Sequence, residues 1–206
     1  MEQESGRREQ ILDAALEEFS SRGFRGATIK GIAKAAGISS PALIYWYFQG
    51  GKESLFQAVL EAHLPIVQVL RDADSLLDRP PEEVLSSVAR SYLATVEKRS
   101  VQRLGRLVLG EALRRPEVAE MLGRHGPERL LAFLNRYLAH QVELGILRPH
   151  DVRASSRALI GMFIPQAVGK VFLPAIAEGG PSDEELVDTA IDLFLRGLRP
   201  DPDGHE

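Results

Sequence analysis

The chain of 206 residues contains no cysteine. This absence excludes disulfide bridges, thiolate zinc sites, iron–sulfur clusters and a cysteine nucleophile. A long apolar run is also missing, because the longest weakly charged stretch, residues 158–173, is shorter than a membrane-spanning helix and contains Pro165 and Lys170. The first residues include no apolar core of the kind found in secretory signals. We therefore expect a cytoplasmic protein that does not contact a membrane.

Signatures of catalysis are missing too. No two histidines have the spacing of a metal-binding pair, and no Gly-x-Ser-x-Gly sequence is present to supply a serine nucleophile. No strand pattern exists that a glycine-rich phosphate loop could follow. The histidines are His63, His125, His140, His150 and His205. The sequence thus predicts no catalytic residue, no metal and no cofactor, and a protein that is not an enzyme.

Acidic residues are absent from one long segment, residues 19–52. The whole chain has a net charge of −4, so this segment differs from the rest of the protein. Its basic residues are Arg22, Arg25, Lys30, Lys34 and Lys52. A compact basic segment on an acidic protein is typical of a surface that binds an anionic polymer such as DNA.

Hydrophobic periodicity predicts helices along nearly the whole chain and no strand. The expected helices cover residues 7–22, 29–36, 39–47, from 52 onward, 80–98, 101–114, 127–144, 151–177 and 186–198, with a short turn near 118–122. Gly23 should end the first helix, and Pro165 should kink the long one. The expected N-caps are Thr28, Ser39 or Ser40, and Ser182, the last in a capping box.

These elements predict an all-α protein of about nine helices in two domains. Residues 1–50 would form a three-helix unit and residues 51–200 a helical body; the family resemblance described below implies that the first is a DNA-binding domain and the second a domain for effector binding and dimerisation. The helix after residue 50 would bridge the two, and residues 201–206 would form a frayed tail.

A helix-turn-helix pattern lies within residues 28–47. Gly37 suits the turn, and the small residues Ser39, Ser40 and Ala42 would let the second helix sit deep in a major groove. The run Tyr-Trp-Tyr-Phe at residues 45–48 follows. Four consecutive side chains cannot all face one core, so we expect Phe48 to pack inward and the others to reach phosphate oxygens.

Residues 7–56 resemble the DNA-binding domain of the tetracycline-repressor (TetR-like) family of bacterial transcription regulators. The resemblance covers about a quarter of the chain, and the remaining helices agree with the family in number and length only. The matching positions are Ile11-Leu12, Ala14-Ala15, Phe19, Gly23, Thr28, Ile32-Ala33, Ala36-Gly37-Ile38-Ser39, Tyr47-Phe48, Lys52 and Leu55.

The resemblance implies a homodimer that binds a palindromic double-stranded operator, with repression as the usual mode. The implied DNA-binding residues are Thr28, Lys30, Ser39, Ser40, Ala42, Tyr45, Trp46, Tyr47 and Lys52. Two departures from the family pattern, one extra residue between Gly37 and Phe48 and one in residues 49–51, leave open which of the three aromatic side chains contact phosphate.

The dimer interface is expected on the last two long helices. Residues 186–198 are apolar on more than one face, so this helix needs two burial partners, the body of its own chain and a second subunit. The alternative is a helix that is fully buried within one chain. The candidate interface residues are Val168, Phe172, Leu186, Ala190, Leu193 and Phe194.

The resemblance also implies a small-molecule effector whose binding moves the bridging helix and spreads the two reading heads. The sequence favours an apolar cavity with a few polar groups, for a hydrophobic or aromatic effector. The candidate lining residues are Leu104, Leu107, Val108, Glu111, Phe133, Tyr137, Met162, Phe163 and Gln166, and each could equally be plain core. The other open interpretation is a ligand-binding helical protein or helical enzyme with a vestigial DNA-binding end.

Overall fold

The computed structural model describes residues 2–63, 65–112, 120 and 127–200, and within them it is helical without strands. The elements are α1 (Glu2–Gly26), α2 (Ile29–Ala35), α3 (Ala42–Tyr47), α4 (Gly51–His63), α5 (Pro65–Val69), the 3-10 helix η1 (Leu70–Leu76), α6 (Pro81–Glu97), α7 (Arg99–Ala112), α9 (Pro127–Glu143), α10 (Val152–Val171), α11 (Pro174–Ala177) and α12 (Asp183–Arg196). The all-α prediction is confirmed.

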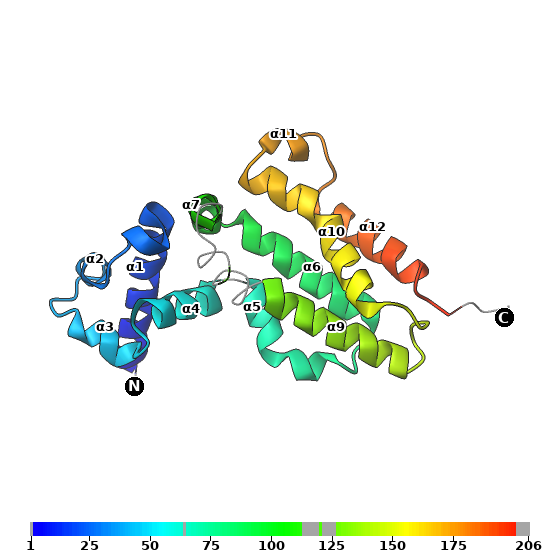
Figure 1. The fold of residues 1–206 in the computed structure, drawn as a ribbon, viewed down its shortest axis with the longest axis horizontal. Helices are drawn as coiled ribbons and strands as arrows, with labels where there is room; N and C mark the ends of the chain where they lie inside the picture. Colours follow the sequence, from blue (N-terminus) through cyan, green and yellow to red (C-terminus); the bar gives the residue numbers. More distant parts are fainter. Residues whose placement is uncertain (1, 64, 113–119, 121–126, 201–206) are drawn as a thin grey trace.

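The buried apolar residues form two clusters, one on either side of the junction between α4 and α5. The first joins α1 to α4 and is centred on three aromatic rings, Phe19, Phe24 and Phe56, whose centroids lie 5.1–5.9 Å apart. We call α1–α4 the head (Figure 1). The buried residues of α4 belong to this cluster as far as Leu60, ten residues past the predicted domain boundary. The boundary itself stays a prediction.

The second cluster holds α5, η1, α6, α9, α10 and α12 together, and we call α5–α12 the body. Its largest fully buried side chain is Tyr137, whose hydroxyl donates to the carbonyl of Arg79 at 2.7 Å. In Figure 1, α7 lies between α1 and the remainder of the body, and α11 projects from the end of α10. Within the described residues, no helix is long and apolar enough to span a bilayer.

Several predicted helix limits are wrong, each for a local reason. The helix expected over residues 151–177 ends at Val171, because Phe172 leaves the helical region and Pro174 starts the separate α11. The first helix begins at Glu2, not at residue 7. Gly23 interrupts the helical backbone as predicted, with φ 71° and ψ 173°, and α1 includes a short further segment that reaches Gly26. The turn expected near residues 118–122 lies outside the described residues, apart from residue 120.

The structure also contains helices that the periodicity missed, and it confirms the capping box. Residues 65–76 form α5 and η1, which are too short to show a helical period. At the start of α12, the Ser182 side chain accepts from the backbone N–H of Glu185, and the Glu185 carboxylate accepts from the N–H of Ser182.

Candidate nucleic-acid interface

The first helix of the helix-turn-helix begins at a side-chain cap. Thr28 is in extended backbone conformation, and its Oγ1 accepts from the N–H of Gly31 at 3.0 Å, as predicted. Lys30 and Lys34 follow on α2, and both are exposed. Buried Ile32 and Ala33 fix the opposite side of α2 to the head core, so the two lysines face away from that core.

Gly37 makes the turn, with φ +62°, a conformation that favours glycine. The N–H of Ile38 then donates to the carbonyl of Ala33 at 2.8 Å, which closes the end of α2. The predicted serine cap of the next helix is wrong: the N-cap of α3 is Pro41, without a side-chain bond, and Ser40 contributes its backbone carbonyl to Leu43 N–H. Because the N–H groups are met by backbone carbonyls, no serine hydroxyl is needed as a cap.

The start of α3 presents small exposed residues, and its end presents aromatic ones. Ser39, Ser40 and Ala42 are exposed. Tyr45 is 52% exposed and Trp46 62%, the highest exposure among the large apolar side chains of the described residues. The Tyr47 ring is half-buried and meets the Trp46 ring edge-on at 4.8 Å, while Phe48 and Ile44 are buried, as expected for Phe48.

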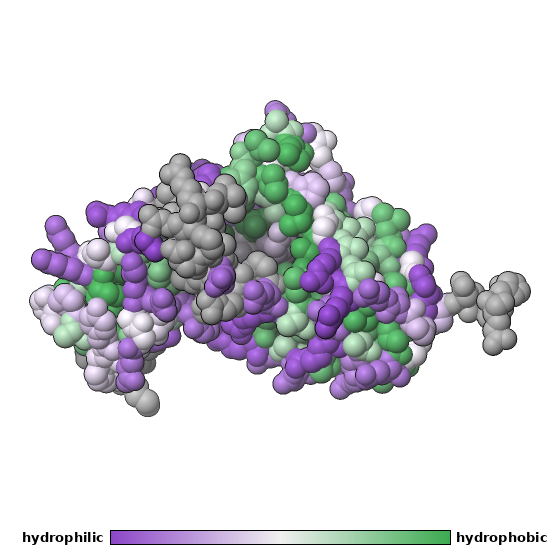
Figure 2. Space-filling view, viewed as in Figure 1, coloured by the Kyte–Doolittle hydropathy of each residue, from purple (hydrophilic) through white to green (hydrophobic). Residues whose placement is uncertain are grey.

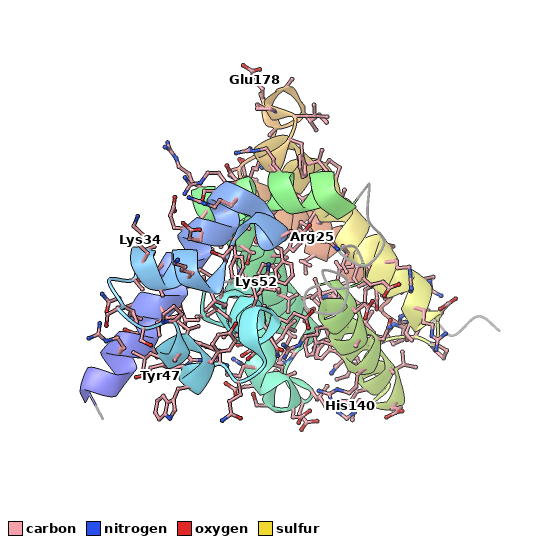
Figure 3. All side chains as sticks on the ribbon, turned by 60° about the vertical axis from the view of Figure 1, so that its left-hand side comes forward. Arg25, Lys34, Tyr47, Lys52, His140 and Glu178 are labelled. Carbon is pink, nitrogen blue, oxygen red and sulfur yellow. The ribbon has the colours of Figure 1, made fainter. Side chains whose placement is uncertain are left out.

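Lys52 lies in the first turn of α4, and its ammonium faces the turn between α1 and α2. The Nζ donates to the carbonyls of Arg25 at 3.3 Å and Ala27 at 3.2 Å, and it lies 4.7 Å from the centre of the Phe24 ring. In Figure 3, Lys52 lies near Arg25, whereas Lys34 and Tyr47 lie at the outer edge of the head. Lys52 therefore joins the start of α4 to the residues that precede the Thr28 cap.

Two arginines of α1 were not among the predicted residues. The guanidinium of Arg8 lies 5.4 Å above the ring of Phe48, and Arg7 donates to Gln10 at 2.9 Å. Both are exposed, and Arg8 adds positive charge beside Phe48 at the end of α3. In the sequence, the positive charge of Arg7 and Arg8 is offset by the neighbouring Glu2, Glu4 and Glu9, so the local net charge did not point to them. Only the contact of Arg8 with Phe48 relates them to α3.

The body contains a small apolar cavity of about 20 Å³. Of the predicted effector residues, Phe163 lines it, and the lining residues that sequence reasoning missed lie on α6, α9 and α10. The full lining is Leu85, Val88, Ala89, Tyr92, Leu130, Leu134, Leu159, Ile160 and Phe163. Tyr92 is the one of these with a polar atom in its side chain, and burial raises the pKa of its hydroxyl.

The other effector candidates lie elsewhere or outside the described side chains. Phe133 and Tyr137 stack in the body core, with ring centroids 5.8 Å apart. Met162 packs at the edge of that core, and Gln166 donates to Asp183 at 2.9 Å. Four candidates on α7, Leu104, Leu107, Val108 and Glu111, have side chains outside the described part.

The candidate dimer residues differ widely in exposure. Leu193 is 59% exposed and Phe172 39%, whereas Ala190 is 3% exposed and packs in the body core. Val168, Leu186 and Phe194 are half-buried. Figure 2 shows a hydrophobic surface over α11 and the adjoining part of α10, where Leu173 and Ile176 are also exposed. Large apolar side chains at the end of α10, on α11 and on α12 are therefore left uncovered by the described part of the chain.

A polar cluster ties α10 to α6 and α12 beside that surface. Lys170 forms ion pairs with Glu97, at 2.8 Å, and with Asp183. Burial lowers the pKa of Lys170, but its bonds to Asp183 and Glu97 outweigh burial and raise it. Burial likewise raises the pKa of Asp183, and the bonds from Lys170 and Gln166 outweigh it and lower that pKa. Among the described side chains, no group of three or more His, Asp or Glu could hold a metal ion.

Known families and proteins match the chain along most of its length. Residues 11–59 match the model of the bacterial regulatory proteins of the tetR family, and residues 83–198 match the C-terminal domain of AefR-like transcriptional repressors. The HTH-type transcriptional regulator SrpR of Pseudomonas putida is 26% identical over 198 residues, which are 95% of this chain and 86% of SrpR.

Solved structures match the fold as well. A TetR-family regulator from Mesorhizobium loti superposes with a TM-score of 0.67 at 25% identity, over 95% of this chain and 98% of that one. The complex of SmeT with triclosan superposes with a TM-score of 0.71 at 24% identity, over 96% and 93% of the two chains. SmeT is the repressor of a Stenotrophomonas maltophilia multidrug efflux pump.

Proposed function

Because this chain belongs to the TetR family of bacterial transcriptional regulators, we propose that it represses transcription as a homodimer bound to a palindromic operator and that a small apolar effector releases it. Repression is supported by the match of residues 83–198 to a repressor domain.

The observation that carries the proposal is the outer surface of α2 and α3. Two aromatic side chains with polar tips, Tyr45 and Trp46, are more than half exposed on a short helix that follows a glycine turn. Exposed aromatic side chains gathered on one surface are typical of interaction sites. The basic side chains around them and the lack of acidic residues over positions 19–52 favour a polyanion.

The roles of the individual residues follow from chemistry and position. Ser39, Ser40 and Ala42, at the exposed start of α3, would face base edges in the major groove. Phosphate contacts would come from the Thr28 hydroxyl, the Lys30 ammonium, and the polar tips of the aromatic residues, with Lys52 adding its charge. Arg7 and Arg8 would extend this set from the first turns of α1.

A homodimer is supported by the apolar surface on α10, α11 and α12. Leu193, Phe172 and Ile176 expose large apolar side chains that the described part of the chain does not cover. A second copy related by a two-fold axis would bury the same surface on both subunits. It would also present two identical heads to a palindrome.

The effector would enter the cavity between α6, α9 and α10. The residues that line the cavity are apolar apart from the hydroxyl group of Tyr92, which favours an apolar or aromatic molecule with at most one hydrogen-bonding group. The present volume of about 20 Å³ is far below the roughly 300–1,000 Å³ of a drug-sized site, so binding has to separate these helices. We expect this separation of α6, α9 and α10 to change the position of the head.

The test is selection from a random-sequence duplex library with the purified protein, followed by sequencing of the bound fraction and salt titration of the best sequence. We expect a palindrome and an affinity that falls steeply with salt, because phosphate contacts release counterions. A variant with Tyr45→Phe and Lys30→Gln loses two proposed phosphate-binding groups at exposed positions, so it should keep the fold and bind DNA more weakly. Recovery of no sequence, by protein whose size and helicity are normal, would contradict operator recognition.

A further inference from the structure

The corner between α6 and α7 contacts three other helices, α1, α4 and α10. We call residues 97–106 the corner. Gln102 closes it by donating its amide to the carbonyls of Val96 at 3.0 Å and Glu97 at 3.4 Å. These bonds satisfy the end of α6, so α7 leaves in a fixed direction.

One side of the corner is joined to α1 at two points. The hydroxyl of Ser20, a residue only 1% exposed, donates to the carbonyl of Ser100 at 3.1 Å. About one turn earlier in α1 and one turn later in α7, the Arg103 guanidinium pairs with the Glu17 carboxylate at 2.9 Å. Two contacts one turn apart oppose both sliding and rotation of α1 against α7.

The same corner holds the end of α4. Lys98 donates its ammonium to the carbonyl of His63, the last residue of α4, at 2.5 Å. The His63 ring lies 3.5 Å from the Asp13 carboxylate of α1. Both helices of the head that approach the body are therefore attached to residues of the corner.

The far side of the corner reaches the helix with the apolar surface. Arg106 donates to the carbonyl of Val171, the last residue of α10, at 2.7 Å. A Cβ built at Gly105 would lie 3.6 Å from the Val171 side chain, so this side chain lies against the backbone of α7. From Ser100 to Arg106, α7 therefore spans from the head to α10 over roughly 9 Å of helix.

We propose that the corner is a lock that fixes the orientation of the head on the body and passes a shift of the last turn of α10 directly to α1. The head then has a second attachment, independent of the chain connection through α4 and α5. This inference rests on the proposed function, since a fixed head orientation is what lets a dimer select one distance between half-sites.

The lock can be tested without operator or effector, because the chain has no cysteine and engineered ones are unique. Spin labels at Lys34→Cys on the head and Ser87→Cys on α6 report the distance between head and body by pulsed electron resonance. Labelled chains are diluted into a large excess of unlabelled protein, so that distances within one chain dominate. The opened variant is Ser20→Ala with Arg103→Glu, which removes one bond and places like charges together.

We expect a single narrow distance distribution in the parent and a broader or split one in the opened variant. Adding Glu17→Arg to the opened variant restores an ion pair and should narrow the distribution again. The matched control, Ser21→Ala with Arg99→Glu, makes the same chemical changes beside the contact and should leave it unchanged. An opened variant as narrow as the parent, with normal helicity, overturns the lock.

A DNA measurement separates this inference from the proposed function. Affinity for a random-sequence duplex should be unchanged in the opened variant, because its reading residues are intact. With the selected palindrome, lengthened or shortened by single base pairs, the parent should prefer one spacing by about tenfold and the opened variant by much less. If no palindrome is recovered but the distances still broaden, the proposed function fails and the lock stands.

Discussion

Lys52 provides the sharpest single test of the head, because its ammonium has two roles to fulfil. It donates to the carbonyls of Arg25 and Ala27 and lies against the Phe24 ring, and it is also proposed to add charge at the DNA surface. The change Lys52→Met keeps an unbranched side chain of similar length and removes the charge and the donors. The two roles then fail in two different measurements.

The loss of stability follows from the contacts. Hydrogen bonds from a charged donor contribute about 1.5–3 kcal/mol each when buried, and a cation over an aromatic ring adds about 0.5–1 kcal/mol. Lys52 is half-buried and bonds at 3.2–3.3 Å, so solvent screening reduces the total to about 2 kcal/mol. In a chain of this size that corresponds to a fall in Tm of about 4–8 °C.

The assays are thermal unfolding and the salt dependence of DNA affinity. In the Lys52→Met variant, the slope of log affinity against log salt should fall by about one unit, since one positive charge at the phosphate-binding surface is removed. Lys34→Met is the control, because exposed Lys34 should change the slope without changing Tm. An unchanged Tm for Lys52→Met would refute the structural reasoning, and an unchanged slope would refute the phosphate role.

Three further predictions concern the body. Leu193→Glu should convert the dimer to monomers, because in the interface the new carboxylate is an unpaired charge that costs several kcal/mol. The stability of the monomer should change little, since this side chain is exposed there. Sedimentation measures the oligomeric state, and a variant that is still a dimer would show that the interface does not include Leu193. Phe163→Ala should enlarge the cavity and lower the unfolding free energy by about 3–5 kcal/mol. It should change the response to the effector while the affinity for the operator stays near normal. Loss of both effector response and operator binding would show that Phe163 has only a structural role in the core. Lys170→Met should lower the unfolding free energy by about 1–3 kcal/mol, because Asp183 and Glu97 lose their partner. The pKa of Asp183 is lowered and that of Lys170 is raised, so the difference in unfolding free energy between parent and variant should be constant through neutral pH. It should become smaller below pH 3.8, where acid protonates Asp183, and above pH 10.5, where Lys170 loses its proton. Urea unfolding across pH measures this difference, and a change of the difference near neutral pH would contradict the assignment.

The helices predicted well from the sequence are those whose signals are local. The capping box at Ser182 and the threonine cap at Thr28 each lie within four residues of the groups they bind, so the pattern alone indicates them. The end of α10 was missed because an apolar run continues through residue 177 and hides the break at Phe172. The short α5 and η1 were missed because segments of five and seven residues are too short to show a hydrophobic period.

In the candidate site, too, the features with a local sequence signal were predicted, and the contacts between residues far apart in the sequence were not. The exposed aromatic residues of α3 and the inward Phe48 were predictable, because they lie within one short pattern. The carbonyl partners of Lys52 lie 25 and 27 residues away in the sequence, and Arg8 meets Phe48 across 40 residues. Most of the cavity wall was likewise missed, because it joins residues of three separate helices whose spacing carries no shared signal.

The size of the cavity has a kinetic consequence. A volume of about 20 Å³ holds no more than a water molecule, so an effector that binds there has to wait until α6, α9 and α10 separate. The observed rate of binding would then rise with effector concentration only up to the rate of that opening and stay level beyond it. The time needed to switch a gene on would have a lower limit set by side-chain packing around Phe163, however much effector the cell contains.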